Sequence, residues 1–134
     1  MGLDNRQRLM DIGFNRVGDW RLVEGRLVFK LDTATTSANV LYAFISGEGQ
    51  VFYIGKTTQT LPKRLMGYQR PGPSQVTNIR NNIEIKILLA LERHVEIYAL
   101  ADTGLLRFGE FTINLAAGLE DALISELKPA WNCR

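Results

Sequence analysis

The sequence predicts an α/β domain built on a small, mostly antiparallel, three-stranded core sheet that is flanked by helices. Short runs rich in β-branched and aromatic residues alternate with longer runs that show helical spacing. The expected strands and helices, in chain order, cover residues 40–45, 51–55, 61–69, 76–91, 95–99 and 115–127. With 134 residues, 46% of them hydrophobic, we expect one domain and no separate specificity domain.

Residues 1–39 are predicted to form an N-terminal extension to a domain that covers residues 40–134. Residues 3–11 favour a short helix. Residues 20–23 and 26–29 are apolar runs on either side of a Glu-Gly turn, a pattern typical of a β-hairpin. This extension could add strands to the sheet, contact a substrate or mediate self-association.

The first two strands of the core sheet are predicted to form a second hairpin, since a Gly-Glu-Gly-Gln loop joins them. If the loop has four residues, Ser46 faces Val51 across the hairpin, and Tyr42 faces Gly55. Tyr42 and Tyr53 then lie on one face of the sheet as diagonal neighbours. Half-buried packing is the ordinary explanation of two tyrosines in such a place.

Prolines mark the ends of the predicted helices. The first helix tolerates Pro62 in its first turn and stops before Pro71, and the last helix ends before Pro129. The middle helix has apolar residues at helical spacing. These are Ile79, Ile83, Ile87 and Leu91.

The composition excludes several kinds of site. One cysteine, Cys133, rules out an internal disulfide, and one histidine, His94, rules out a zinc cluster of the Cys/His kind. Any metal here must be a hard ion bound by oxygen. Neither residue is assigned a function, and Trp131 is predicted to belong to the core. Because no apolar run has the length of a membrane span, we expect a soluble cytoplasmic protein with no membrane partner.

The positive charges are concentrated in one stretch of the chain. The net charge is only +2, but no acidic residue lies between Glu48 and Glu84. The basic residues within that stretch are Lys56, Lys63, Arg64, Arg70 and Arg80. Such a segment suits a phosphate backbone, and the alternative is a solvated basic face.

Arg64 and Tyr68 are four residues apart on a predicted helix, so both can address one phosphate. The alternative is an exposed arginine that stacks on a tyrosine. At the end of the second strand, Gly55 would let a phosphate approach the backbone, and Lys56 would supply charge.

Glu120 falls inside the apolar arc of the last helix, which Leu119, Leu123 and Leu127 define. Its neighbour Asp121 falls outside the arc. Turning a carboxylate inward costs several kcal/mol unless a cation or hydrogen-bond donors compensate. A bound Mg²⁺ is one such compensation, and a buried ion pair with Arg64 or Lys56 is the other.

Taken together, these motifs resemble the GIY-YIG nucleases. The matching residues are Val40-Leu41-Tyr42, Tyr53-Ile54-Gly55, Lys56, Arg64, Tyr68, Glu120 and the ending Lys128-Pro129-Ala130-Trp131-Asn132. The first motif departs from the family's Gly-Ile-Tyr at two positions and keeps the tyrosine. Among small stand-alone members, the phage endonuclease II group looks nearest, through its Glu-bearing C-terminal helix.

The resemblance implies an endonuclease that hydrolyses DNA with one Mg²⁺ or Mn²⁺ ion per site, held by Glu120. The implied catalytic residues are Tyr42, Tyr53, Lys56, Arg64, Tyr68, Glu120 and Asn132. Tyr42 would be the general base, which requires cationic neighbours such as Lys56 to lower its pKa. The residues expected to contact substrate are Gly55, Lys63, Arg70 and Arg80.

Two other nuclease classes fit the sequence poorly. A PD-(D/E)xK enzyme needs an aspartate that residues 49–83 lack, and an HNH enzyme needs a second histidine. The rival from another class is a catalytically silent nucleic-acid-binding module on the same fold. The sequence does not distinguish DNA from RNA, and a homo-oligomer is a hypothesis, since one site cuts one strand.

Overall fold

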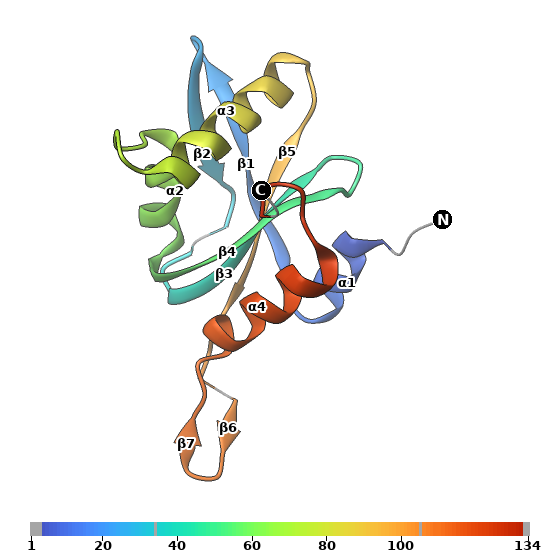
Figure 1. The fold of residues 1–134 in the computed structure, drawn as a ribbon, viewed down its shortest axis with the longest axis vertical. Coiled ribbons are helices and arrows are strands. Elements are labelled where there is room, and N and C mark those ends of the chain that lie inside the picture. The colour runs from blue at the N-terminus through green and yellow to red at the C-terminus, as the bar shows by residue number, and fades with distance from the viewer. Residues whose placement is uncertain (1–3, 34, 105, 133–134) are drawn as a thin grey trace.

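The computed structural model describes residues 4–33, 35–104 and 106–132. Its centre is a five-stranded antiparallel sheet with strand order β2-β1-β5-β3-β4 (Figure 1). The strands are β1 (Asn15–Val23), β2 (Arg26–Leu31), β3 (Ala38–Ser46), β4 (Val51–Thr60), β5 (Val95–Ala101), β6 (Arg107–Phe108) and β7 (Phe111–Thr112). The helices are α1 (Asn5–Asp11), α2 (Leu61–Gln69), α3 (Val76–Ala90) and α4 (Leu115–Leu127).

The main sheet is larger than predicted, because the N-terminal hairpin joins it. Strands β3, β4 and β5 form the predicted core, and β1 pairs with the free edge of β5, with Asp19 opposite Glu96. This pairing covers an edge that would otherwise expose unpaired backbone groups. The sheet was predicted to be mostly antiparallel, and all strand pairings in the described residues are antiparallel.

The predicted pairing of Ser46 with Val51 is wrong. The register of the β3–β4 hairpin shifts between Phe44 and Ile45, so that Ile45 faces Val51. Ser46 instead closes the loop, because its backbone N–H donates to the carbonyl of Gln50 at 2.9 Å and its Oγ accepts from the Gln50 N–H at 3.0 Å. A β-bulge of this kind adds a residue to one strand without moving the pairs further along.

The helices agree with the sequence prediction to within one residue for α2, α3 and α4. Helix α1 begins at Asn5, after Asp4 has capped it by accepting from the Gln7 N–H at 3.1 Å, and residue 3 lies outside the described chain. The short β6–β7 hairpin was not predicted, because strands of two residues leave no alternating pattern. It protrudes from the body of the molecule (Figure 1).

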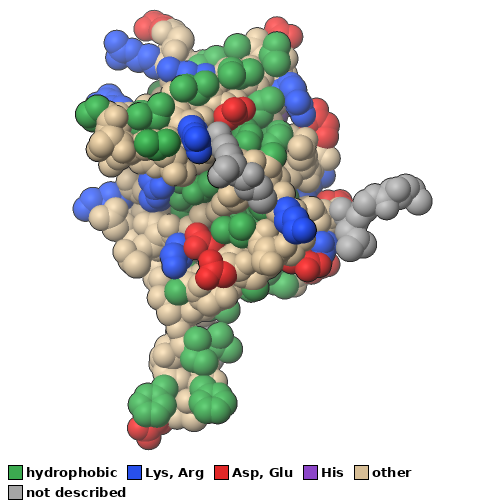
Figure 2. Space-filling view, viewed as in Figure 1, with side chains coloured by type: hydrophobic (Ala, Val, Ile, Leu, Met, Phe, Trp, Pro, Cys, Tyr) green, Lys and Arg blue, Asp and Glu red, His purple; other side chains and the backbone are tan. Residues whose placement is uncertain are grey.

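The apolar stripe of α3 faces solvent, and not the core as its spacing would suggest. Ile83 and Ile87 are each 50% exposed, and Leu91 is 67% exposed. Figure 2 shows hydrophobic side chains gathered over this helix and on the β6–β7 hairpin. The buried residues of α3 are Asn78, Asn81, Asn82 and Ile85. Three buried amides mean that this helix packs against a polar neighbour.

Two hydrophobic layers lie on opposite faces of the sheet, because alternate residues of β3 point to opposite sides. Tyr42 and Phe44 belong to the layer beneath α2 and α3. Leu41, Ala43 and Ile45 belong to the layer beneath α1 and α4. Figure 1 shows the helix pairs on these two sides. None of the helices in the described parts of the chain has the length and apolar character of a membrane span.

Candidate active site

A hydrogen-bonded chain joins Arg64 to two buried tyrosines beneath α2. The Tyr42 and Tyr68 hydroxyl oxygens are 2.6 Å apart, and Arg64 Nη2 donates to the Tyr68 hydroxyl at 2.8 Å. The guanidinium also lies 4.2 Å from the centroid of the Tyr68 ring. The ring of Tyr53 lies 6.3 Å from that of Tyr42 and 6.2 Å from that of Tyr68. Four residues from two strands and a helix thus converge.

Gly55 is required by the Tyr42 ring. The two residues face each other across β3 and β4, as predicted. A Cβ added at Gly55 would lie 2.5 Å from the Tyr42 hydroxyl oxygen and 2.6 Å from its Cζ. Such distances are far below van der Waals contact, so only glycine leaves room for the ring here. The predicted approach of a phosphate is therefore not needed to explain this glycine, since the Tyr42 ring requires it.

Burial governs the protonation of the two hydrogen-bonded tyrosines. Tyr42 is 1% exposed and Tyr68 is fully buried, and burial raises the pKa of both hydroxyls. Proximity to Tyr53 raises the pKa of Tyr42 further, while Arg64 and the hydrogen bond with Tyr68 act against the rise. The expectation that Lys56 lowers the pKa of Tyr42 is not met, because the cation beside Tyr42 is Arg64.

Lys56 pairs with Glu120 on the opposite face of the sheet. Lys56 Nζ lies 3.8 Å from Glu120 Oε1, so of the two cations named as alternatives, Arg64 and Lys56, the lysine is the one that lies beside this carboxylate. The Glu120 side chain is only 17% exposed, which agrees with its place in the apolar arc, and Asp121 is exposed. Burial raises the pKa of Glu120, and Lys56 partly offsets that rise.

The two groups of residues meet at the edge strand β4. Gly55 contacts Tyr42 on one face, and the next residue, Lys56, reaches Glu120 on the other. Within the described residues no hydrogen bond or ion pair connects Lys56 or Glu120 with Tyr42 or Arg64. The structure therefore assembles the predicted residues in two clusters, which the strand edge separates.

The C-terminal segment closes part of that edge. Asn132 Oδ1 accepts from the Ile54 N–H, and its Nδ2 donates to the Ile54 carbonyl, both at 2.9 Å. Trp131 donates its backbone N–H to the Phe52 carbonyl at 2.9 Å and stacks on the Phe52 ring at 4.8 Å. Trp131 also packs against the core, as predicted. Asn132 is the last described residue of the segment, and Cys133 lies outside the described residues.

The remaining predicted residues are on the surface, and one contributor was missed. Lys63, Arg70 and Arg80 are exposed on α2, at its end and on α3. The missed residue is Asn78, which is 8% exposed and whose Oδ1 accepts from Arg64 Nη2 at 2.9 Å. A run of asparagines along one side of α3, opposite its isoleucines, was the signal available in the sequence.

The carboxylate of Glu120 is of the chemical type that Mg²⁺ or Mn²⁺ takes as a ligand. Mg²⁺ binds through one or two carboxylates and keeps several waters or substrate oxygens, so it needs no complete protein cage. The described residues contain no cluster of three or more His, Cys, Asp or Glu side chains that could form such a cage. A partly buried carboxylate whose counter-ion is a single lysine at 3.8 Å provides the right donor.

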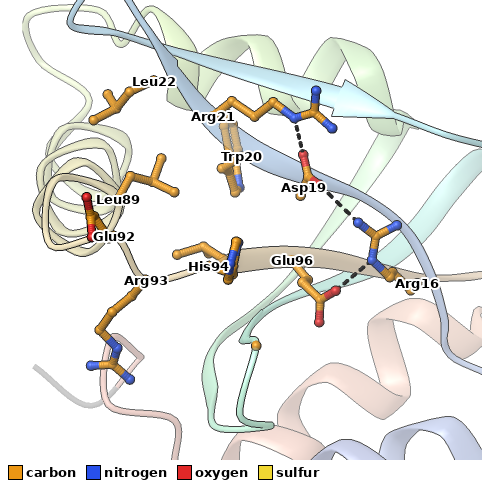
Figure 3. Close-up of a pocket in the computed structure, with 12 residues that line it drawn as sticks. Arg16, Asp19, Trp20, Arg21, Leu22, Leu89, Glu92, Arg93, His94 and Glu96 are labelled. Carbon is orange, nitrogen blue, oxygen red and sulfur yellow. Dashed lines mark hydrogen bonds and ion pairs between the residues drawn. The ribbon is translucent and has the colours of Figure 1, made fainter.

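A cavity of about 880 Å³ lies elsewhere, between β1, the end of α3 and the start of β5 (Figure 3). His94 lines it, but none of the residues predicted for the active site does. Its cations are already paired, since Arg16 contacts Asp19 at 3.0 Å and Glu96 at 2.7 Å. We therefore place the candidate site at β4 and α2.

The sheet order, the helix positions and the motifs define the fold of the GIY-YIG nucleases. One similar solved structure is a mutant of bacteriophage T4 EndoII, with a TM-score of 0.77, 23% identity, and coverage of 97% of this chain and 99% of that chain. Another is the restriction endonuclease Hpy188I in complex with product DNA, with a TM-score of 0.56, 17% identity, and coverage of 92% and 79%. No family model and no curated protein matches the sequence.

Proposed function

We propose that the protein is a divalent-metal-dependent endonuclease of the GIY-YIG kind, which hydrolyses phosphodiester bonds in DNA. The observation that carries this proposal is the hydrogen-bonded chain from Arg64 through Tyr68 to Tyr42, beside the strand end that bears Lys56. A guanidinium fixed next to two phenols is suited to steadying a phosphate. The fold of the chain is shared with EndoII and with Hpy188I, and the structure of Hpy188I was solved with product DNA.

Hydrolysis requires a deprotonated water, a fixed phosphate and a stabilised leaving oxygen. In our proposal Tyr42 first gives up its own proton to solvent. Its phenolate oxygen then takes a proton from the water, whose oxygen attacks phosphorus while the bond to the 3′ oxygen breaks. Arg64 and Lys56 hold the phosphate, and Tyr53 and Tyr68 position phosphate or water. Glu120 would hold the divalent ion, which when bound would supply positive charge for the leaving oxygen.

The other predicted residues have supporting parts in the proposal. Asn132 keeps the strand end in place through its two bonds to Ile54. DNA would extend along the exposed basic residues of α2 and α3. These are Lys63, Arg70 and Arg80. Residues 40–134 would form the catalytic unit, and residues 1–39 would buttress it through β1.

One observation favours the silent binding module. Tyr42, the proposed base, is buried and its pKa is raised, so it keeps its hydroxyl proton and must lose that proton and contact water before it can act as a base. Cleavage assays separate the two functions. A module that binds duplex DNA without turnover would show equal binding with and without metal.

The test is cleavage of supercoiled plasmid with Mg²⁺ or Mn²⁺ and with a chelator. We expect wild type to nick the plasmid only with metal, and Glu120→Gln and Arg64→Ala to lose at least a hundredfold in rate. Asp121→Asn is the matched control, because it removes a carboxylate next to Glu120 that is exposed. Binding by every variant and cleavage by none, wild type included, would reject the enzyme and leave the silent module.

A further inference from the structure

We propose that Asn78 is a positioning residue for Arg64, and that Gln75 holds Asn78 in the required orientation. The proposal rests on the proposed nuclease function, in which Arg64 steadies the phosphate. Neither residue belongs to the motifs that suggested that function. Both lie at the start of α3.

The hydrogen bonds fix both ends of the Asn78 amide. Its Oδ1 accepts from Arg64 Nη2 at 2.9 Å, and its Nδ2 donates to Gln75 Oε1 at 3.0 Å. Because the donor end is engaged by Gln75, the acceptor end must face the guanidinium. Asn78 is 8% exposed, so water competes little for these bonds. Arg64 Nη2 is therefore shared between the Tyr68 hydroxyl and Asn78.

Gln75 is tied in turn to the loop before α3. Its Oε1 also accepts from the backbone N–H of Gly72 at 2.9 Å, so the glutamine oxygen receives two hydrogen bonds. The resulting chain runs from Gly72 through Gln75 and Asn78 to Arg64. A connected chain of this kind holds a flexible arginine in one rotamer, which reduces the entropy lost when a phosphate binds.

A glycine in α2 supplies independent support. A Cβ added at Gly67 would lie 3.1 Å from Arg64 Nη1 and 3.2 Å from Asn78 Nδ2. Both distances are shorter than ordinary van der Waals contacts, so a side chain at Gly67 would crowd the Arg64 guanidinium and the Asn78 amide. Glycine costs about 1 kcal/mol in a helix interior, and the space it leaves here is occupied by this pair.

The neutral amide also matters for the chemistry. A carboxylate at this position would hold the guanidinium at least as firmly, but it would neutralise the charge that the phosphate needs. An amide oxygen orients Arg64 and leaves its charge available. This reasoning predicts that Asn78→Asp, the closest substitution in shape, impairs the reaction more than Asn78→Ala does.

The test measures cleavage of a labelled DNA duplex with Mg²⁺ for wild type, Asn78→Ala, Asn78→Asp and Gln75→Ala. We expect kcat to fall ten- to a hundredfold for Asn78→Ala with KM changed less than threefold, since a 1 Å misplacement of a catalytic group costs about a hundredfold. Asn78→Asp should fall further, and Gln75→Ala three- to tenfold. Thr77→Ala, an exposed neighbour on α3, is the control and should match wild type.

A second readout, nitrogen NMR of the Arg64 guanidinium without DNA, keeps the two proposals separable. Hindered rotation should give distinct Nη signals in wild type and Asn78→Asp, which should merge in Asn78→Ala. If wild type never cleaves but these signals behave as stated, the nuclease function fails and the positioning role stands. Suppose that wild type cleaves. The positioning role is then wrong if folded Asn78→Ala has a kcat within twofold of wild type, or if the kcat of Asn78→Asp is higher than that of Asn78→Ala. If Asn78→Ala does not fold, Gln75→Ala decides by the same two measurements.

Discussion

Replacing Gly55 with alanine tests how closely the strand end and the tyrosines are fitted. The added Cβ would meet the Tyr42 hydroxyl oxygen at 2.5 Å, whereas ordinary contact begins at 3.4 Å, so the ring must withdraw by about 0.9 Å. The backbone of Gly55 does not have a positive φ, so alanine is compatible with the local conformation. Any cost must therefore come from the ring.

The size of that cost follows from two contributions. Overpacking a buried site costs about 1–3 kcal/mol. A ring shift of about 0.9 Å would also stretch the 2.6 Å bond between the Tyr42 and Tyr68 hydroxyls beyond hydrogen-bond range, which adds about 1 kcal/mol. We expect Gly55→Ala to lower the free energy of unfolding by about 2–4 kcal/mol, and to reduce the cleavage rate in the fraction that remains folded.

The assay is urea unfolding of the single variant, of Tyr42→Leu, and of the two substitutions combined. Because leucine lacks the hydroxyl and the far side of the ring, Gly55→Ala should cost less than about 1 kcal/mol in that background. An equal cost in both backgrounds would show that the clash with Tyr42 is not the cause. A cost below about 0.5 kcal/mol in the wild-type background would refute the packing argument altogether.

Four further predictions concern other parts of the site and fold. Asn132→Asp should lower the free energy of unfolding by about 1–3 kcal/mol, because it removes the donor to the Ile54 carbonyl and sets a carboxylate against it; urea unfolding should show the loss, and an unchanged free energy of unfolding would contradict it. Asp102 accepts from the backbone N–H groups of Gly104 and Leu115, which lowers its pKa, so it stabilises the fold above the pKa of an unfolded aspartate and loses that effect as the pH falls through its folded value. Asp102→Asn should therefore cost about 1 kcal/mol at pH 7 and nothing measurable at strongly acidic pH, and a pH-independent difference in urea unfolding would disprove this. Ile85→Ala should cost about 2–4 kcal/mol, and Ile87→Ala, half exposed on the same helix, under 1 kcal/mol, so that equal costs would show the assigned face of α3 to be wrong. Because burial raises the pKa of Tyr42, the cleavage rate should keep rising toward alkaline pH, and a plateau near neutrality would remove Tyr42 as the base.

The sequence predicted those parts of the fold that local chemistry determines. Proline punctuation and apolar spacing defined α2 and α4, and the loop glycines placed Tyr42 opposite Gly55. The inward direction of Glu120 followed from helix geometry alone. Each of these features depends on residues close together in the chain, where turn and helix rules apply directly.

The missed features depend on partners far apart in the chain. Strand β1 pairs with β5 across about eighty residues, which no local pattern encodes. On α3 the usual rule that apolar residues face inward fails, because the helix packs against Arg64 and needs the amide of Asn78 there. The two-cluster arrangement about β4 also escaped prediction, since matching motifs identify residues and not the faces on which they lie.

Because successive side chains of β4 point to opposite faces, the site does not tolerate a shift in the register of this strand. Gly55 and Lys56 are neighbours that point to opposite faces, so a slide of one position that brings Lys56 into the place of Gly55 would drive the lysine into the Tyr42 ring and replace it opposite Glu120 with Thr57. The two hydrogen bonds between Asn132 and Ile54, the residue before Gly55, hold the strand next to the two residues that such a shift would displace. Asn132, the last described residue of the chain, thus helps to fix the register of β4 and with it the positions of Gly55 and Lys56.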